Sequence, residues 1–322
     1  MPHAITLRHV GGPERLEWTE ISVPPPGPNE VQLRQMAVGL NFIDVYQRTG
    51  LYPVPVPFVP GQEGAGVVTA LGDGVTTVRV GDRVAYAGLA GAYATVRNAP
   101  VDRLVLVPDG IDDTLAASLM LKGMTAEFLL RRCRPVKPGD TILFHAAAGG
   151  VGQLAVPWAR HLGATVIGVV GREQKVALAR EAGAHHVLIQ GPELARQVKE
   201  LTHGVGVQVA FDSVGKDTLE ASLDALAPRG MLVLFGQSSG KPPPLDLGVL
   251  GGARSLYVTR PSLFAYIATR AELESSAYAV FAAVREGVLP APPPRTFALA
   301  RAADAHRALE ARETTGAVVL LP

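Results

Sequence analysis

Cysteine is almost absent from this sequence. The single cysteine, Cys133, lies among arginines and cannot form a disulfide within the chain. Disulfide frameworks are typical of small secreted proteins, so their absence fits a reducing compartment. The N-terminal residues also lack the apolar run of a signal peptide. We therefore expect a cytoplasmic protein.

Long hydrophobic runs and an excess of one charge are also missing. No uninterrupted apolar stretch reaches the ~18 residues that a membrane-spanning helix needs. The chain has 30 basic and 29 acidic side chains, for a formal net charge of +1. A protein that neutralises many phosphates normally carries a basic excess. These absences argue against a membrane protein and against a nucleic-acid partner.

The chain is long and apolar enough for a large core. It has 322 residues, of which 48% are hydrophobic and 18% charged, and its length favours two domains. The first third is rich in short β-prone runs separated by turn signals, with a short helix expected at Phe42–Arg48. Closely spaced prolines exclude a longer helix there, among them Pro53, Pro55, Pro57 and Pro60.

From about Leu119 the pattern changes to strands that alternate with helices, which predicts βαβ units and a parallel sheet. Helices are expected at 151–162 and 173–182, the second closed by Gly183. The expected strands are 141–144, 165–170, 187–189, 207–211 and 231–235. This is the pattern of a doubly wound nucleotide-binding fold.

The last part of the chain departs from that pattern again. A helix at 271–286, a proline-rich connection, a final helix and a terminal strand at 318–321 are expected. We therefore predict a discontinuous first domain, residues 1–123 together with 265–322, and an inserted nucleotide-binding domain, residues 124–264.

A glycine-rich loop separates the first strand and helix of the inserted domain. In the pattern G-x-G-x-x-G its three small residues are Ala147, Gly149 and Gly152. Small residues allow a tight turn, close approach to a pyrophosphate, and helix–strand packing. The pyrophosphate then meets the free N–H groups at the start of the helix. The loop therefore predicts a dinucleotide site.

The end of the second strand indicates which dinucleotide is bound. An NAD site normally has an acidic residue there, which binds the ribose 2′-hydroxyl. Here the strand ends at Gly171, and Arg172 and Lys175 follow. Two cations beside an open position suit a 2′-phosphate. We therefore predict NADPH as the cofactor.

Several motifs resemble the medium-chain dehydrogenase/reductase superfamily, and some resemble its zinc-free quinone oxidoreductase (zeta-crystallin-like) branch. The superfamily motifs are Gly61-Gln62-Glu63-Gly64-Ala65-Gly66, Gly81-Asp82-Arg83-Val84, Lys122-Gly123-Met124-Thr125-Ala126, His145 to Gly152 and Phe211-Asp212-Ser213-Val214-Gly215. The branch motifs are Asn41-Phe42-Ile43-Asp44, Tyr52-Pro53, Phe235 to Gly240 and Leu256 to Ser262.

The resemblance covers essentially the whole chain. It implies an α/β protein with a GroES-like, β-rich catalytic domain and a Rossmann domain. It also implies a homodimer that reduces a small-molecule quinone with NADPH. One position departs from the family pattern: Gln190 stands where relatives often have a tyrosine beside the adenine ribose.

The resemblance also implies site residues. Around the nicotinamide and the quinone it places Asn41, Phe42, Asp44, Tyr46, Tyr52, Lys122 and Thr125. Around the pyrophosphate and the adenosine phosphate it places Gly150, Val151, Gly171, Lys175 and Arg312, beside the loop glycines Gly149 and Gly152 and the cation Arg172. The later strands contribute Ser213, Gly236, Gln237, Ser238, Thr259 and Arg260.

No metal is expected. Zinc alcohol dehydrogenases of the superfamily have Cys and His where this chain has Asn41 and Gln62, and an amide pair is a poor substitute for thiolate and imidazole. Chemistry without a metal suits quinones and activated enones, which accept hydride readily. As catalytic residues we predict the hydrogen-bond donors Asn41, Tyr46 and Tyr52.

Two other functions remain open at this stage. The same scaffold suits an NADPH-dependent enone or enal reductase, which would act on an activated double bond. Zeta-crystallin-like relatives have also been given structural and RNA-binding roles. The near-zero net charge argues against an RNA-binding surface.

Overall fold

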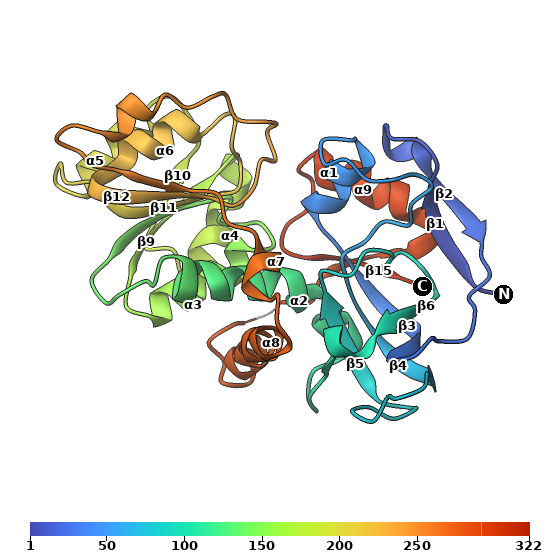
Figure 1. Cartoon of the computed structure of the whole chain (residues 1–322). Coiled ribbons are helices and arrows are strands. Elements are labelled where there is room, and N and C mark those ends of the chain that lie inside the picture. The colour runs from blue at the N-terminus through green and yellow to red at the C-terminus, as the bar shows by residue number, and fades with distance from the viewer. Residues whose placement is uncertain (291) are drawn as a thin grey trace. The chain divides into compact units, whose positions relative to one another are not determined.

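The two sequence patterns fold into two separate units in the computed structural model, which describes residues 1–290 and 292–322 (Figure 1). The first unit contains Met1–Met124, Ile267–Arg285 and residues 292–322. The second contains Thr125–Tyr266 and Glu286–Pro290.

The first unit is built mainly from antiparallel strands. Its large sheet has seven strands in the order β14-β15-β3-β4-β5-β7, with β6 paired to β3, and β1 and β2 form a separate pair. The strands are β1 His3–Leu7, β2 Leu16–Glu20, β3 Glu30–Leu40, β4 Glu63–Leu71, β5 Arg83–Ala87, β6 Val96–Pro100, β7 Val105–Leu106, β14 Arg295–Ala298 and β15 Val318–Leu321.

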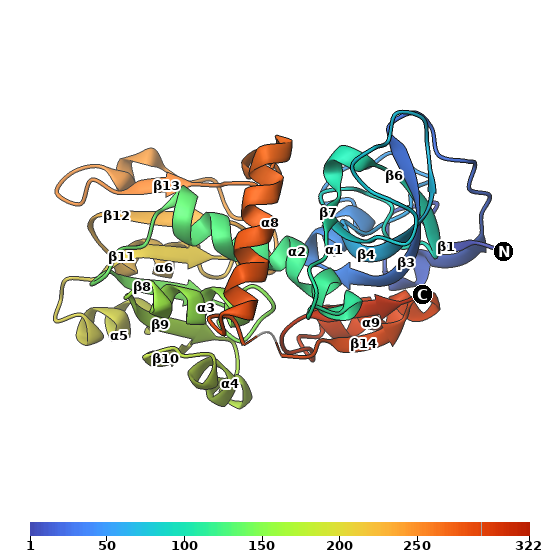
Figure 2. The ribbon, with the colours of Figure 1, turned by 90° about the horizontal axis from the view of Figure 1, so that it is seen from below.

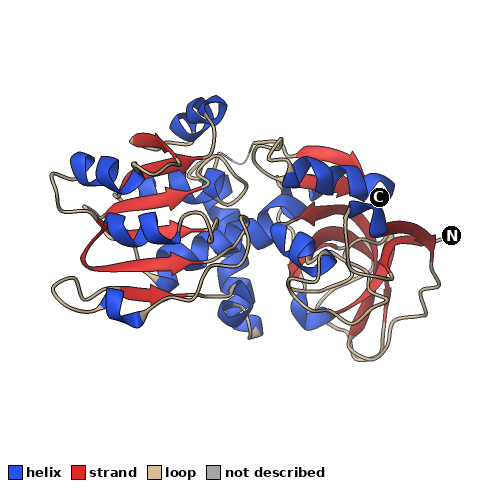
Figure 3. Ribbon diagram, turned by 90° about the horizontal axis from the view of Figure 1, so that it is seen from above, coloured by secondary structure: helices blue, strands red, loops and turns tan. Residues whose placement is uncertain are grey.

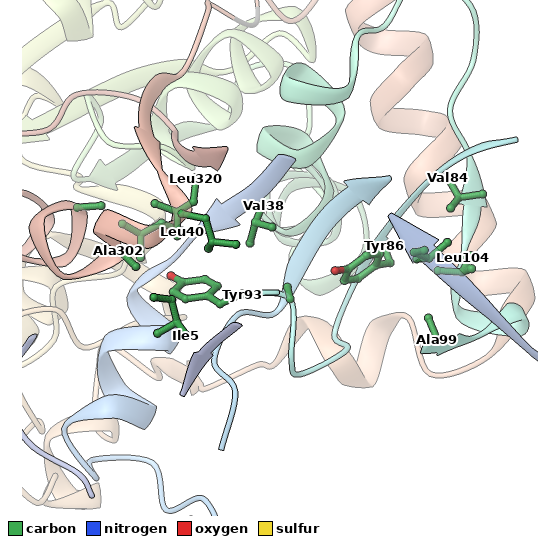
Figure 4. Close-up of a cluster of buried hydrophobic side chains, with 14 of the residues drawn as sticks. Ile5, Val38, Leu40, Val84, Tyr86, Tyr93, Ala99, Leu104, Ala302 and Leu320 are labelled. Atoms are coloured by element: carbon green, nitrogen blue, oxygen red, sulfur yellow. The ribbon is translucent and has the colours of Figure 1, made fainter. Parts of the chain in front are cut away.

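One hydrophobic core fills this unit and joins the two ends of the chain (Figure 4). Ile5 and Leu40 come from its N-terminal strands, and Ala302 and Leu320 from its last helix and strand. The helices are α1 Phe42–Arg48, α2 Asp113–Phe128, α8 Arg270–Arg285 and α9 Ala302–Glu310, and the unit boundary falls within α2 after Met124.

The second unit contains one parallel sheet of six strands in the order β10-β9-β8-β11-β12-β13 (Figure 2). The strands are β8 Thr141–His145, β9 Thr165–Val170, β10 His186–Ile189, β11 Val207–Asp212, β12 Leu226–Leu234 and β13 Tyr257–Thr259. The chain starts in the middle of the sheet, at β8, runs outward to β10, and then returns to β11 on the other side of β8. Strand order therefore reverses between β8 and β11, where doubly wound sheets bind ligands.

Helices pack on this sheet as the βαβ pattern requires (Figure 3). They are α3 Gly152–His161, α4 Val176–Glu181, α5 Leu194–Leu201 and α6 Leu219–Ala225, and a fifth helix, α7 Leu263–Tyr266, follows β13. Helices α3 and α4 contact one another, as do α5 and α6, and the two pairs lie on opposite faces of the sheet (Figure 1).

The predicted doubly wound sheet is confirmed. The helices expected at Phe42–Arg48, 151–162 and 271–286 correspond to α1, α3 and α8. The helix expected at 173–182 is a 3₁₀ turn, Glu173–Lys175, followed by the short α4. Strand β14 was not expected, because it follows directly on a proline-rich connection. Within the described residues, no helix combines the length and apolarity of a membrane span.

Candidate functional site

The glycine-rich loop of the second unit runs from the end of β8 to the start of α3. The Ala147 amide donates a hydrogen bond to the Val169 carbonyl at 3.0 Å, which ties the loop to the neighbouring strand. A Cβ on Gly152 would lie 2.5 Å from the carbonyl oxygens of Ala146 and Ala147, and one on Gly149 would lie 3.1 Å from the Ala146 oxygen. The tight turn therefore requires glycine at 152 and a small residue at 149.

The alanine at the first position of the motif has a compensating glycine. Ala147 is fully buried, and a Cβ on Gly168 of β9 would lie 2.9 Å from the Ala147 Cβ. The extra methyl group of Ala147 thus occupies space that a side chain at 168 would otherwise fill. This pairing explains how the loop keeps its geometry without its first glycine.

The start of α3 is suited to an anion. The backbone N–H groups of Gly150, Val151 and Gly152 donate to no other backbone group of the described chain. Unpaired N–H groups at a helix N-terminus, together with the helix dipole, attract a phosphate. The tight turn at Gly149 and Gly152 and these backbone N–H groups together fit the pyrophosphate of a dinucleotide.

A buried hydrogen-bond network supports the two loops at the reversal point of the sheet. The Ser222 hydroxyl donates to Asp212 at 2.8 Å and lies 2.9 Å from His145 Nε2. Asp212 also accepts from Thr218 and from the amide of Val214. Burial lowers the pKa of His145, against the attraction of Asp212. The network therefore fixes the ends of β8 and β11 relative to each other with a neutral imidazole.

The predicted residues after the later strands gather at the same edge of this sheet. The Ser238 amide donates to the Ser213 carbonyl at 3.1 Å, and a Cβ on Gly236 would lie 2.7 Å from that carbonyl. Arg260, just beyond Thr259 of β13, donates to the Gln237 side chain at 2.7 Å. The structure thus brings together Ser213, Gly236, Gln237, Ser238 and Arg260.

The predicted 2′-phosphate residues lie at the end of β9. Gly171 and Arg172 are exposed directly after Val170, and Lys175 ends the following 3₁₀ turn. The Gln190 amide donates to the Val170 carbonyl at 2.8 Å, so the departure from the family pattern lies beside this position. Thr125, which was predicted near the nicotinamide, lies in α2 and is buried.

In the first unit, Asn41 lies between β3 and α1 and contacts a buried ion pair. Its side-chain amide donates to Glu63 at 2.8 Å, and the Lys122 ammonium reaches the same carboxylate oxygen at 2.5 Å. All three residues are buried. Asn41 and Lys122 were predicted site residues, whereas Glu63 was not, although it lies in the motif that begins at Gly61.

Three aromatic residues follow Asn41. The rings of Phe42 and Tyr46 on α1 are 6.1 Å apart, and those of Tyr46 and Tyr52 are 5.1 Å apart in an edge-on arrangement. Tyr46 is buried and Tyr52 is partly exposed. The predicted catalytic tyrosines are therefore neighbours in one cluster.

Asp44 lies beneath this cluster, with its side chain fully buried. It accepts from the backbone N–H of Asn41 at 2.9 Å and from the Tyr93 hydroxyl at 3.1 Å. That hydroxyl also lies 3.1 Å from His306 Nε2. Burial raises the pKa of Asp44 to about 7, which hydrogen bonds from Asn41 and Tyr93 oppose. Asp44 therefore has no exposed surface in this structure and lies one hydrogen bond behind Asn41, and its predicted role as a cofactor contact stays a prediction.

The far end of this network is also buried. Burial, followed by the charge of Arg48, lowers the pKa of His306 to about 3. Burial and the charge of Asp44 raise the pKa of Tyr93 well above its ordinary value. Arg48 is fully buried and pairs with Glu310 at 2.7 Å. No sequence motif indicated Tyr93 or His306, because they lie far from Asp44 along the chain.

We expect Asp44→Asn to change how the stability of the first unit depends on pH. Between the ordinary pKa of 3.8 and about 7, the folded protein holds a proton on Asp44 that the unfolded chain has released. Stability should therefore fall as pH rises through this window, by about 4 kcal/mol at 1.36 kcal/mol per pKa unit. Asparagine lacks this effect, so the variant should gain that amount relative to the parent between pH 4 and pH 8. The contribution of His306 is common to both proteins and cancels in the difference.

Urea unfolding followed by tryptophan fluorescence measures this difference. The chain has two tryptophans, Trp18 in the first unit and Trp158 in the second, so a Trp158→Phe background isolates the signal of the first unit. Asp109→Asn, at an exposed position of the same unit, is the control and should run parallel to the parent. A parallel curve for Asp44→Asn would contradict the prediction.

Arg312, which sequence reasoning placed at the adenosine phosphate, lies in the first unit. It is exposed and follows α9 in a left-handed conformation with φ of 59°. Its proposed role as a cofactor contact stays a prediction.

The side chains around Asn41 do not suit a zinc ion. Gln62 donates to Gln47 at 3.2 Å, Asn41 to Glu63, and an ammonium group already pairs with that carboxylate. Zinc sites in proteins use thiolate, imidazole and carboxylate ligands. In the described part of the chain, no three His, Cys, Asp or Glu side chains converge as a metal site would require. The donor set therefore does not fit the metal of zinc-dependent dehydrogenases.

Two family models match the chain. The model described as "Alcohol dehydrogenase GroES-like domain" matches residues 27–109, and the model described as "Zinc-binding dehydrogenase" matches residues 150–275. They confirm the GroES-like and Rossmann parts of the predicted fold.

Relatives that match over the whole chain show which branch of the family it belongs to. The chain is 49% identical over 325 residues to a quinone oxidoreductase of Pseudomonas aeruginosa, covering 100% of both chains. It is 46% identical over 334 residues to a 2-haloacrylate reductase of Burkholderia sp, covering 100% of this chain and 99% of the relative. The structure of Escherichia coli quinone oxidoreductase complexed with NADPH matches with a TM-score of 0.97 and 44% identity, covering 99% of this chain and 100% of that one. The chain belongs to the medium-chain dehydrogenase/reductase superfamily, in its quinone oxidoreductase branch.

Proposed function

We propose that this protein is an NADPH-dependent oxidoreductase that reduces quinones without zinc. NADPH supplies the hydride when bound. The second unit offers the phosphate loop for its pyrophosphate and the cations after β9 for its 2′-phosphate. Identity of 45–49% to quinone oxidoreductases over the whole chain, and similarity to a solved quinone oxidoreductase structure that contains NADPH, support the proposal.

The observation that carries the choice of acceptor is the donor set at the start of α1. The Asn41 amide uses one N–H for Glu63, which leaves its second for an acceptor. The hydroxyls of Tyr46 and Tyr52 come from the adjacent aromatic cluster. Such donors stabilise oxygen that becomes negative during hydride transfer, and the aromatic rings suit a planar acceptor.

A second candidate function is reduction of an activated carbon–carbon double bond. The 2-haloacrylate reductase relative, at 46% identity, favours it. Both reactions place negative charge on an acceptor oxygen, so the same donors would serve.

Three further predictions from the sequence belong to the proposed function as a whole: the homodimer, the cytoplasmic location and the division into domains.

An acceptor panel tests the proposal. NADPH oxidation would be followed by its absorbance with 1,4-benzoquinones, alkenals, enones and 2-haloacrylates. Higher catalytic efficiency with quinones supports the leading function, and higher efficiency with double-bond acceptors supports the second. No oxidation with any acceptor would contradict both.

Removing one donor at the acceptor site should lower turnover more than it weakens NADPH binding. We expect Asn41→Ala and Tyr52→Phe each to lower kcat about 100-fold, because one hydrogen bond to a developing oxyanion is worth ~2–4 kcal/mol. Tyr278→Phe, at an exposed position on α8, is the control and should keep the kcat of the parent. Near-parental kcat in both site variants would place the acceptor elsewhere.

A further inference from the structure

The ion pair of Lys122 and Glu63 is built into the first unit. The ammonium lies 2.5 Å from Glu63 Oε1, with the two side chains 7% and 0% exposed. That oxygen also accepts from Asn41, and the other carboxylate oxygen accepts from the Leu121 amide at 2.5 Å. Three donors from two different segments thus hold the carboxylate.

Glycines on both sides make room for this pair. Gly39 of β3 stands opposite Glu63 in the ladder with β4, and a Cβ there would lie 2.1 Å from Glu63 Oε1. Gly123, the residue after Lys122, allows α2 to approach α8, since its Cβ would lie 2.6 Å from Val280. The backbone is therefore shaped to bring a charged carboxylate and an ammonium to Asn41.

Burying one charge here without the other would be strongly unfavourable. Lys122 therefore brings a positive charge next to Asn41, the residue that stands where zinc alcohol dehydrogenases of the superfamily have a metal ligand. It donates one of its three N–H groups to Glu63. Asn41 and Lys122 bind the same carboxylate oxygen, so their remaining N–H groups lie close enough together to bind one acceptor oxygen.

We propose that Lys122 is a catalytic residue of this site: its ammonium stabilises the acceptor oxyanion, and Glu63 positions it. This inference rests on the proposed function, and it gives Lys122 a role in catalysis rather than only in cofactor binding. It also accounts for a zinc-free site that still has a cation at its centre.

The chemistry balances without a change in the protonation of Lys122. Hydride transfer from NADPH, which leaves NADP⁺, delivers two electrons and one proton and would convert a quinone to a hydroquinone monoanion or an enone to an enolate. Lys122 and Asn41 donate hydrogen bonds to the negative oxygen. A proton from water then neutralises the product, and the ammonium keeps its own protons.

The test compares Lys122→Met and Lys122→Arg with the parent protein over a series of 1,4-benzoquinones whose hydroquinones differ in acidity. We expect Lys122→Met to lower kcat by 100- to 1000-fold, in the range for loss of an oxyanion donor. NADPH affinity, measured by fluorescence titration, should change less than threefold. The loss should grow as the hydroquinone becomes a weaker acid, and Lys122→Arg should recover at least tenfold. An equal loss with every quinone would overturn the proposal.

A double variant covers the case in which Lys122→Met fails to fold around an unpaired carboxylate. Glu63→Gln with Lys122→Met removes both charges, so it relieves that problem while leaving the site without a cation. We expect a folded protein that binds NADPH and remains at least 100-fold slower than the parent. Recovery of parental kcat in the double variant would show that the pair is only structural and would overturn the proposal.

Metal analysis adds a readout that does not depend on turnover. The purified parent should contain far less than one zinc per chain, and prolonged chelation should leave its kcat unchanged. One tightly held zinc per chain whose removal abolishes activity would overturn the proposal. The acceptor panel on the parent judges the proposed function, whereas the ratio of variant to parent with a working acceptor judges Lys122, so the two failures are distinguishable.

Discussion

Gly152→Ala is expected to weaken NADPH binding by more than 100-fold. The added Cβ would lie 2.5 Å from two backbone carbonyl oxygens, those of Ala146 and Ala147, and neither is a flexible group that can rotate away. The loop must shift, and its N–H groups then miss the pyrophosphate. Each hydrogen bond to a charged group is worth ~1.5–3 kcal/mol, so the loss of two corresponds to more than two decades in Kd.

Fluorescence titration with NADPH measures this effect, and circular dichroism shows whether the second unit remains folded. Gly191→Ala is a matched control in the same unit, because no atom lies within 4 Å of its added Cβ. We expect Gly149→Ala to be intermediate, since its closest contact is 3.1 Å. A Kd for Gly152→Ala within threefold of the parent would show that the cofactor does not depend on this turn.

In the second unit, the features that the sequence predicted well are those determined by residues adjacent along the chain. Helix α3 begins within one residue of the expected position because the glycines and the apolar face that follow are adjacent in sequence. Helix α3 contains Pro157 and continues through it to His161. The substitution of Ala147 for glycine was visible in the sequence, but its compensation by Gly168 needed the pairing of β8 with β9.

At the proposed acceptor site, only the residues that lie close together in sequence could be predicted. Asn41, Tyr46 and Tyr52 are close in sequence, so a motif could identify them together. The partners that set their environment are distant: Tyr93 and His306 are 213 residues apart, and Glu63 and Lys122 are 59 apart. Burial, rather than residue type, produces the shifted pKa values of Asp44 and His306, and burial at this depth is known only from the fold.

The cofactor preference is expected to depend on Gly171 and Lys175. Strand β9 ends at Val170, and the next residue, Gly171, is exposed and carries no carboxylate for a ribose 2′-hydroxyl. Lys175→Ala should weaken NADPH about tenfold and leave NADH nearly unchanged, because one charge-assisted contact is worth ~1.5–3 kcal/mol. Gly171→Asp should lower the ratio of NADPH to NADH efficiency further, by about 100-fold, since its carboxylate repels the phosphate and accepts from the free hydroxyl.

Catalytic efficiencies with NADPH and NADH, measured with one quinone at two salt concentrations, test this dependence. The difference between parent and Lys175→Ala should shrink at high salt, because exposed charges are screened. Lys137→Ala, at an exposed lysine elsewhere in the second unit, should keep the parental preference. Equal efficiency with both cofactors in the parent would contradict the predicted preference for NADPH. Arg172 and Lys175 would then be ordinary surface residues of the turn that follows β9.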